Sequence, residues 1–214
     1  MFSRLIIATV LFTATGITAG YSSPANWRAG VVAEVEKQQD IDDANALKIG
    51  KWAEIGYQEF KSSSLLQKRL KKAGFSVSSG VAGMPTAFIA TYGNGGPVIG
   101  FLAEYDALTG FSQTGDPEPT PVEGQIAGHA CGHNLLGSGV VLAAVATKEW
   151  MTRHKLKGTI KVFGTPAEEG GGGKVYFARD GLLDNVDAVM NWHPDSYNGS
   201  ITKSNLAMIA GKFR

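Results

Sequence analysis

Three apolar runs that lead into polar segments are the feature of the sequence that most constrains its fold. The runs are residues 97–103 (PVIGFLA), 159–164 (TIKVFG) and 187–192 (DAVMNW). A continuous apolar run such as 97–103 is typical of a strand buried on both faces of a parallel sheet. Because helix-like segments alternate with these runs, the sequence predicts an α/β fold, with a mostly parallel sheet flanked by helices.

Helices are expected before and between these strands. Residues 25–60 carry apolar side chains at roughly helical spacing. A second helix is expected over 65–73, with a serine of the preceding triplet as its N-cap and Gly74 just after its end. The segment 135–151 is apolar nearly all round, so it predicts a helix packed in the interior, and a short helix is expected around 175–180.

The composition excludes several classes of protein. Lys and Arg number 20 against 19 Asp and Glu, so the net charge of +1 offers no basic surplus for binding nucleic acid. Hydrophobic residues make up 43% of the chain and charged residues 18%, a balance that supports a buried core. The single cysteine excludes an intramolecular disulfide framework and a multi-cysteine zinc finger.

The start of the chain has the pattern of a signal peptide. Arg4 is followed by an apolar run over residues 5–14 and then by small residues that offer a cleavage site. We therefore expect residues 1–20 to be removed and the protein to be exported, as a periplasmic or secreted protein. The competing interpretation is an N-terminal membrane anchor, because no charge occurs between Arg4 and Arg28. A spanning helix, however, needs roughly twenty predominantly apolar residues.

Reactive side chains follow the ends of the three predicted strands. The first run is followed by Glu104 and Asp106, the second leads to Glu168 and Glu169, and the third leads to His193. The carboxyl ends of parallel strands share one edge of a sheet, and ligands bind at that edge. We therefore expect these side chains to lie close together.

A fourth polar segment, GHACGHN at residues 128–134, precedes the predicted interior helix. Asn134 is expected to cap that helix, which would place Cys131 and His133 near the positive end of the helix dipole. A thiolate is favoured there, and the thiolate is the form of cysteine that binds metals. Sulfur, imidazole and carboxylate groups from separate loops suit Zn²⁺ or Mn²⁺, so the sequence predicts a metal site.

Two other interpretations of these segments are weaker. Residues 170–174 (GGGGK) are similar to a phosphate-binding loop, but Glu168 stands at the first glycine position and Val175 replaces the required Ser or Thr. A cysteine-dependent hydrolase needs a base that faces the thiol. In this chain, His193 would have to serve as that base for Cys131.

Four segments in this order resemble the aminoacylase and carboxypeptidase-type metallopeptidase family, in its amidohydrolase branch: GFLAEYDALTGFSQ, GHACGHNLLGSG, GTPAEEGGGGK and NWHP. The resemblance implies a zinc-aminopeptidase-like catalytic domain with two Zn²⁺ or Mn²⁺ ions. It implies hydrolysis of an amide bond in a small molecule, such as an N-acyl amino acid, an aminobenzoyl-glutamate-like conjugate or a dipeptide. It also implies a homodimer or a dimer of paired subunits, and no nucleic-acid partner.

The resemblance also assigns roles to individual side chains. It places Glu168 as the general base and Asp106 as an acidic residue that supports the site from behind the ligands. It assigns metal ligation to four residues: Cys131, His133, Glu169 and His193.

Members of that family are longer than this chain, which implies a division into three parts. Residues 1–20 would be the signal peptide, 21–199 the N-terminal part of the catalytic domain, and 200–214 the start of a truncated lid or dimerisation domain. A further histidine ligand would then follow Arg214. The alternative to an enzyme is an inactive remnant that binds metal or a partner.

We predict that the chain is cleaved after Ala19 or Gly20, because the charged start, the apolar run and the small residues coincide. N-terminal sequencing of the protein purified from an expressing bacterium should find the new terminus there. Recovery of a soluble cytoplasmic protein that still begins at Met1 would contradict this prediction.

Overall fold

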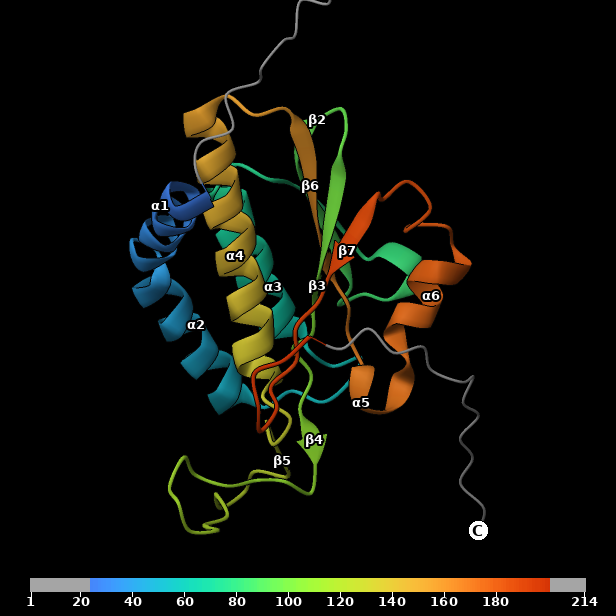
Figure 1. The fold of residues 1–214 in the computed structure, drawn as a ribbon. Helices are drawn as coiled ribbons and strands as arrows, with labels where there is room; N and C mark the ends of the chain where they lie inside the picture. Colours follow the sequence, from blue (N-terminus) through green and yellow to red (C-terminus); the bar gives the residue numbers. More distant parts are fainter. Residues whose placement is uncertain (1–23, 201–214) are drawn as a thin grey trace, which may run out of the picture.

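A computed structural model describes residues 24–200, which form a five-stranded sheet with helices on both faces (Figure 1). The predicted signal peptide over residues 1–20 lies outside the described residues. Nearly all of the predicted start of a second domain, over residues 200–214, also lies outside them. Among the helices of the described part, none is long and apolar enough to cross a membrane.

The sheet is mixed, with its parallel strands on one side. In spatial order it contains β1 (Ser76–Ser79), β2 (Phe88–Asn94), β6 (Gly158–Gly164), β3 (Val98–Ala103) and β7 (Ala188–Met190). The strands β6, β3 and β7 pair in parallel, whereas β2 pairs antiparallel with both β6 and β1. The α/β class is therefore confirmed, and the three apolar runs are the three parallel strands. The antiparallel pairs come from the segments that precede them in the chain.

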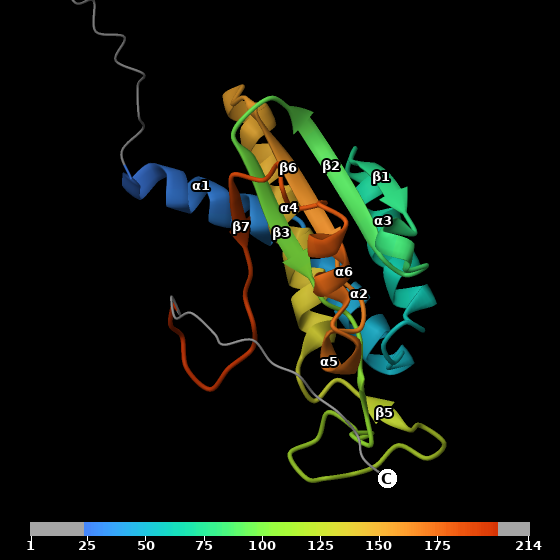
Figure 2. The ribbon, with the colours of Figure 1, turned by 90° about the vertical axis from the view of Figure 1, so that its right-hand side faces the viewer.

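Four helices cover one face of the sheet: α1 (Pro24–Glu36), α2 (Gln39–Trp52), α3 (Phe60–Lys72) and α4 (His133–His154). The helix α4 packs on β3 and β6, α3 packs on β1 and β2, and the helices α1 and α2 pack against α4. In Figure 2, α4 lies behind the sheet and α6 lies in front of it. The parallel strands are therefore covered on both faces, as their apolar sequences require.

The opposite face carries shorter elements: η1 (Val81–Gly83), α5 (Glu168–Gly171) and α6 (Gly173–Arg179). A two-stranded sheet of β4 (Leu108–Thr109) and β5 (Ala127–Gly128) lies beyond the end of β3 (Figure 1). The loop between β4 and β5 carries exposed acidic residues and several prolines. The helix predicted around 175–180 therefore exists and begins two residues earlier.

The core consists of two apolar clusters, one on each side of the sheet. The cluster under α4 includes Leu66, Phe88, Val141 and Ile160, which are at most 1% exposed. The cluster under α6 is smaller and centres on Phe163 and other side chains of that face. Burial of each such side chain stabilises the fold by about 1.5–3 kcal/mol.

Two expectations about the helices were wrong. The helical spacing over 25–60 covers two helices and an irregular segment, because α2 ends at Trp52 and Ala53 takes a left-handed conformation with φ of 42°. The serines do not cap α3, which already begins at Phe60. Instead Ser62 donates a hydrogen bond to the Glu54 carboxylate from within the helix. The expected stop at Gly74 agrees with its φ of 92°.

A close approach between α4 and the end of β3 positions the polar edge of the sheet. Gly137 lies on α4, where a Cβ atom would stand 2.6 Å from the carbonyl oxygen of Glu104. No larger residue fits that gap unless the helix moves away from the strand. Gly139 differs, because a Cβ atom there would meet the ring of Trp192 at 3.3 Å, and that ring is 42% exposed.

We predict that Gly137→Ala lowers the free energy of unfolding by about 1–3 kcal/mol, because the added methyl group overpacks a buried contact with backbone. Gly139→Ala is the matched control on the same helix. It should be neutral or raise stability by up to about 1 kcal/mol, since alanine favours helix and the Trp192 ring has room to shift. Urea denaturation of both variants checks this, and equal effects would contradict it.

Candidate metal centre

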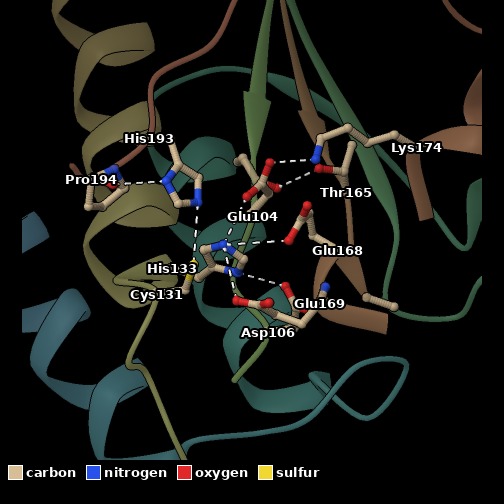
Figure 3. Close-up of polar contacts among 12 residues, drawn as sticks. Glu104, Asp106, Cys131, His133, Thr165, Glu168, Glu169, Lys174, His193 and Pro194 are labelled. Atoms are coloured by element: carbon tan, nitrogen blue, oxygen red, sulfur yellow. Dashed lines mark hydrogen bonds and ion pairs between the residues drawn. The ribbon is translucent and has the colours of Figure 1, made fainter. Parts of the chain in front are cut away.

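Four segments bring polar side chains together at the carboxyl edge of the parallel strands (Figure 3). Glu104 and Asp106 follow β3 directly, and α5 follows β6 after a short turn. His193 lies three residues beyond the end of β7. Cys131 and the first residue of α4, His133, approach from the helical layer. The structure thus brings together all six residues to which the sequence and its resemblance assigned a role.

The ring of His133 is the centre of this arrangement. It is fully buried, and its Nδ1 lies 2.9 Å from an Asp106 oxygen. Its Nε2 lies 3.0 Å from Glu104 Oε2, 3.7 Å from Glu169 Oε1 and 3.9 Å from Glu168 Oε2. One imidazole therefore faces four carboxylates.

This crowding controls the protonation of the buried groups. Burial lowers the pKa of His133, but the carboxylates of Asp106 and Glu104 outweigh burial and raise that pKa to about 10. Burial raises the pKa of Glu104, yet His133 and Lys174 bring it below the usual value. The pKa of Glu168 is raised, chiefly by burial and then by the neighbouring Glu104 charge. The site as folded therefore calls for a positive charge at its centre.

The second oxygen of Asp106 ties another element to the site. Asp106 Oδ2 accepts a hydrogen bond from the backbone N–H of Glu169 at 2.9 Å. Asp106 thus fixes both the tautomer of the His133 ring and the start of α5. A carboxylate that orients a histidine in this way is typical of metal sites.

The surroundings of Cys131 differ from the sequence-based expectation. The N-cap of α4 is Gly132, with φ of 75°. Asn134 lies inside the helix, where its side chain donates to the carbonyl of Ala46 at 3.3 Å, so the expected Asn134 cap was wrong. Burial and the neighbouring Glu169 raise the pKa of the Cys131 thiol to about 11. The protein alone therefore does not favour the thiolate, and a bound cation would have to supply that stabilisation.

The donor set fits a metal ion. Cys131, His133 and His193 present ligand atoms within 4.8 Å of one another, and the same holds for Glu104, His133 and Glu168. Within the described part of the chain, three buried atoms of the site have no hydrogen-bond partner: Glu104 Oε2, His133 Nε2 and Glu169 Oε1. Buried polar atoms without partners are costly, and a divalent cation would satisfy all three.

Two residues of the site were not assigned a role from the sequence. Glu104 and Asp106 are two positions apart in extended chain, so both face the site, whereas Tyr105 between them is fully buried in the core. That alternation was a usable signal for Glu104. Lys174 contacts Glu104 Oε1 at 2.5 Å, and no local pattern indicated this pairing.

A cavity of about 380 Å³ adjoins the carboxylates. Asp106 and Glu169 form part of its wall, together with Tyr57, Thr109 and Gly171. Tyr57 is fixed there, because its hydroxyl donates to the carbonyl of Gly171 at 2.7 Å. The polar centre is therefore accessible from a cavity of small-molecule size.

A helix-covered sheet whose parallel strands bring a thiol, imidazoles and carboxylates to one edge is the arrangement of an α/β metallohydrolase. Residues 100–204 match the sequence profile of peptidase family M20/M25/M40. The chain belongs to this family.

Characterised relatives support this assignment. The chain is 42% identical over 182 residues to one of the subunits of p-aminobenzoyl-glutamate hydrolase of Escherichia coli, covering 85% of this chain and 37% of that protein. It is 32% identical over 154 residues to N-acetyl-L-cysteine deacetylase of Bacillus subtilis, covering 70% and 36%. The chain thus spans well under half the length of these relatives.

Solved structures share the fold. A putative aminohydrolase from methicillin-resistant Staphylococcus aureus matches with a TM-score of 0.63 at 21% identity, covering 75% of this chain and 41% of that one. A dinuclear metal-binding peptidase of the M20 family from Bacillus subtilis matches with a TM-score of 0.56 at 26% identity, covering 76% and 42%.

We predict that Asp106→Ala lowers the free energy of unfolding of the EDTA-treated protein by about 3–5 kcal/mol, because it leaves the buried His133 ring and the Glu169 N–H without their partner. Asp116→Ala is the control, since Asp116 is exposed and bonds only to the nearby Thr114 hydroxyl among the described residues. Its effect should stay within about 0.5 kcal/mol. Urea unfolding measures both, and similar values for the two would refute the anchoring role of Asp106.

Proposed function

We propose that this protein is a metal-dependent amidohydrolase that cleaves the amide bond of a small molecule. The observation that carries the proposal is the convergence of Cys131, His133 and His193 with buried carboxylates at one edge of the sheet. Membership of a peptidase family and relatives named for hydrolysing p-aminobenzoyl-glutamate or deacetylating N-acetyl-L-cysteine support it. The substrate class is accordingly an N-acyl amino acid, an aminobenzoyl-glutamate-like conjugate or a dipeptide.

The residues divide into ligands and a base. Four of them would hold one or two Zn²⁺ or Mn²⁺ ions: Cys131, His133, Glu169 and His193. The solved relative described as dinuclear supports two ions. A bound ion would supply an activated water and polarise the scissile carbonyl. Asp106 holds the His133 ring so that Nε2, the ring atom facing the site, is the ligand.

Glu168 is suited to the role of general base. Its side chain is 39% exposed, whereas that of Glu169 is 18% exposed, so Glu168 is the one more open to water and substrate. In the reaction, Glu168 takes the proton of the attacking water and later delivers it to the leaving nitrogen. The less exposed Glu169 is held by the bond from its backbone N–H to Asp106.

Location and assembly are further parts of the proposal. Export to the periplasm or outside the cell follows from the signal-peptide pattern of residues 1–20. A homodimer or a dimer of paired subunits is supported by the Escherichia coli relative, whose name makes it one of several subunits of a hydrolase.

A cysteine-dependent hydrolase is the second candidate, favoured by the distance of 3.5 Å between Cys131 Sγ and His193 Nε2. The pKa of about 11 for that thiol, raised by burial and Glu169, opposes it. Treatment with EDTA separates the two candidates. Only the metal enzyme should lose hydrolysis of aminobenzoyl-glutamate on chelation and recover it with Zn²⁺ or Mn²⁺.

We predict that Glu168→Gln retains metal almost normally but lowers kcat by at least about 10² to 10⁴-fold, since it removes one positioned proton-transfer group. Glu169→Gln should instead weaken metal retention and be partly rescued by excess Zn²⁺ or Mn²⁺. Metal analysis after dialysis and release of aminobenzoate are the measurements. Exchanged phenotypes would reverse the two roles, and full activity in both variants would refute the metal-hydrolase proposal.

A further inference from the structure

One buried carboxylate at the centre of the site has no role in the mechanism described so far. Glu104 is 2% exposed and directly follows β3. Its Oε1 contacts the ammonium of Lys174 at 2.5 Å. Its Oε2 lies 3.0 Å from His133 Nε2 and has no hydrogen-bond partner among the described residues. The two oxygens thus have different surroundings, one neutralised and the other aimed into the site.

The glycine run is what brings Lys174 to this position. Gly172 is left-handed, with φ of 62°, and a Cβ atom at Gly173 would overlap the carbonyl of Pro166. A Cβ atom at Gly171 would stand 2.6 Å from the ring of Tyr57. The run therefore folds the chain tightly back, so that α6 begins beside the end of β3 (Figure 3). These glycines meet steric requirements and are not a flexible spacer.

Lys174 offsets part of an unbalanced charge. Four carboxylates face the His133 ring, and a buried carboxylate is stable only when a partner compensates for its lost hydration. Lys174 compensates for one oxygen of Glu104 and is itself 31% exposed. The other oxygen depends on whatever occupies the space at His133 Nε2.

A bound ion would change that space in a defined way. A ring nitrogen that binds a metal has no proton to donate. When His133 Nε2 acts as a ligand, Glu104 Oε2 therefore loses the ring N–H as a donor while remaining buried. The ion itself is then the cation within reach of that oxygen. Glu104 also belongs to a group of potential ligands with His133 and Glu168.

We propose that Glu104 is an additional metal ligand of this protein, held in position by the ion pair with Lys174. The inference rests on the proposed function in so far as a divalent cation binds at His133. Glu104 adds a carboxylate ligand to the set of Cys131, His133, Glu169 and His193. Lys174 is a positioning residue, which acts on the ion through Glu104.

The test measures Zn²⁺ affinity of the EDTA-stripped 214-residue protein by competition with a chromogenic chelator. Glu104→Gln preserves shape and removes the charge, so the affinity of at least one ion should fall by about tenfold or more. Lys174→Met should weaken the same ion in the same direction, and Lys174→Arg should restore affinity. Glu149→Gln is the control, because that residue pairs with Lys148 on α4 outside the site.

A double variant distinguishes positioning from a general effect of charge. If Lys174 acts through Glu104, adding Lys174→Met to Glu104→Gln should cause no further loss of Zn²⁺ affinity. A further loss equal to that of Lys174→Met alone would overturn the positioning role. Far-UV circular dichroism shows whether each variant is folded. If Glu104→Gln is unfolded, the more exposed Lys174 decides, and unchanged affinity in Lys174→Met overturns the proposal.

The remaining outcomes separate this inference from the proposed function. Wild-type protein that binds Zn²⁺ together with a folded Glu104→Gln variant of equal affinity overturns only the role of Glu104. Wild-type protein that binds neither Zn²⁺ nor Mn²⁺ overturns the proposed function as well.

Discussion

A buried imidazole enclosed by carboxylates is the interaction on which the rest of the site depends. His133 is held by Asp106 on one side, while Glu104 faces it on the other at 3.0 Å. Such a cluster is stable only when its charges are paired and their hydrogen bonds are satisfied. The fold provides this by ending parallel strands at one edge and pressing α4 against β3, where Gly137 leaves no room for a side chain. The packing of the fold and the chemistry of the site are therefore one constraint.

Much of the fold could be predicted, because the parallel strands are marked by local sequence. Their apolar runs and the polar residues after them follow from burial on both faces. The irregular segment before α3 could not be predicted in this way. Glu59 in that segment is fully buried, and its carboxylate accepts hydrogen bonds from Thr86 and from the backbone N–H of Ala167. Those partners lie 27 and 108 residues away, so no local pattern contains them.

The site shows the same division. Spacing and family resemblance located Cys131 and the other expected ligands, because each follows a strand or precedes a helix. The expectation for Asn134 failed, since Gly132 in a left-handed conformation already begins the helix. Lys174 was missed because its contact with Glu104 depends on a tight glycine turn whose path is steric. Sequence patterns thus indicate which edge carries the chemistry, whereas the charge balance of that edge emerges only in three dimensions.

The alternation after β3 has an evolutionary consequence. Glu104 and Asp106 face the polar edge, while Tyr105 points into the core and donates to the carbonyl of Thr86. Substitutions at these positions would each alter one contact. A deletion or insertion of a single residue here would reverse every side chain, placing carboxylates in the apolar core and a phenol at the polar edge. Descendants of this protein should therefore vary this stretch by replacement and keep its length fixed, while gaining and losing residues in the exposed loop between β4 and β5.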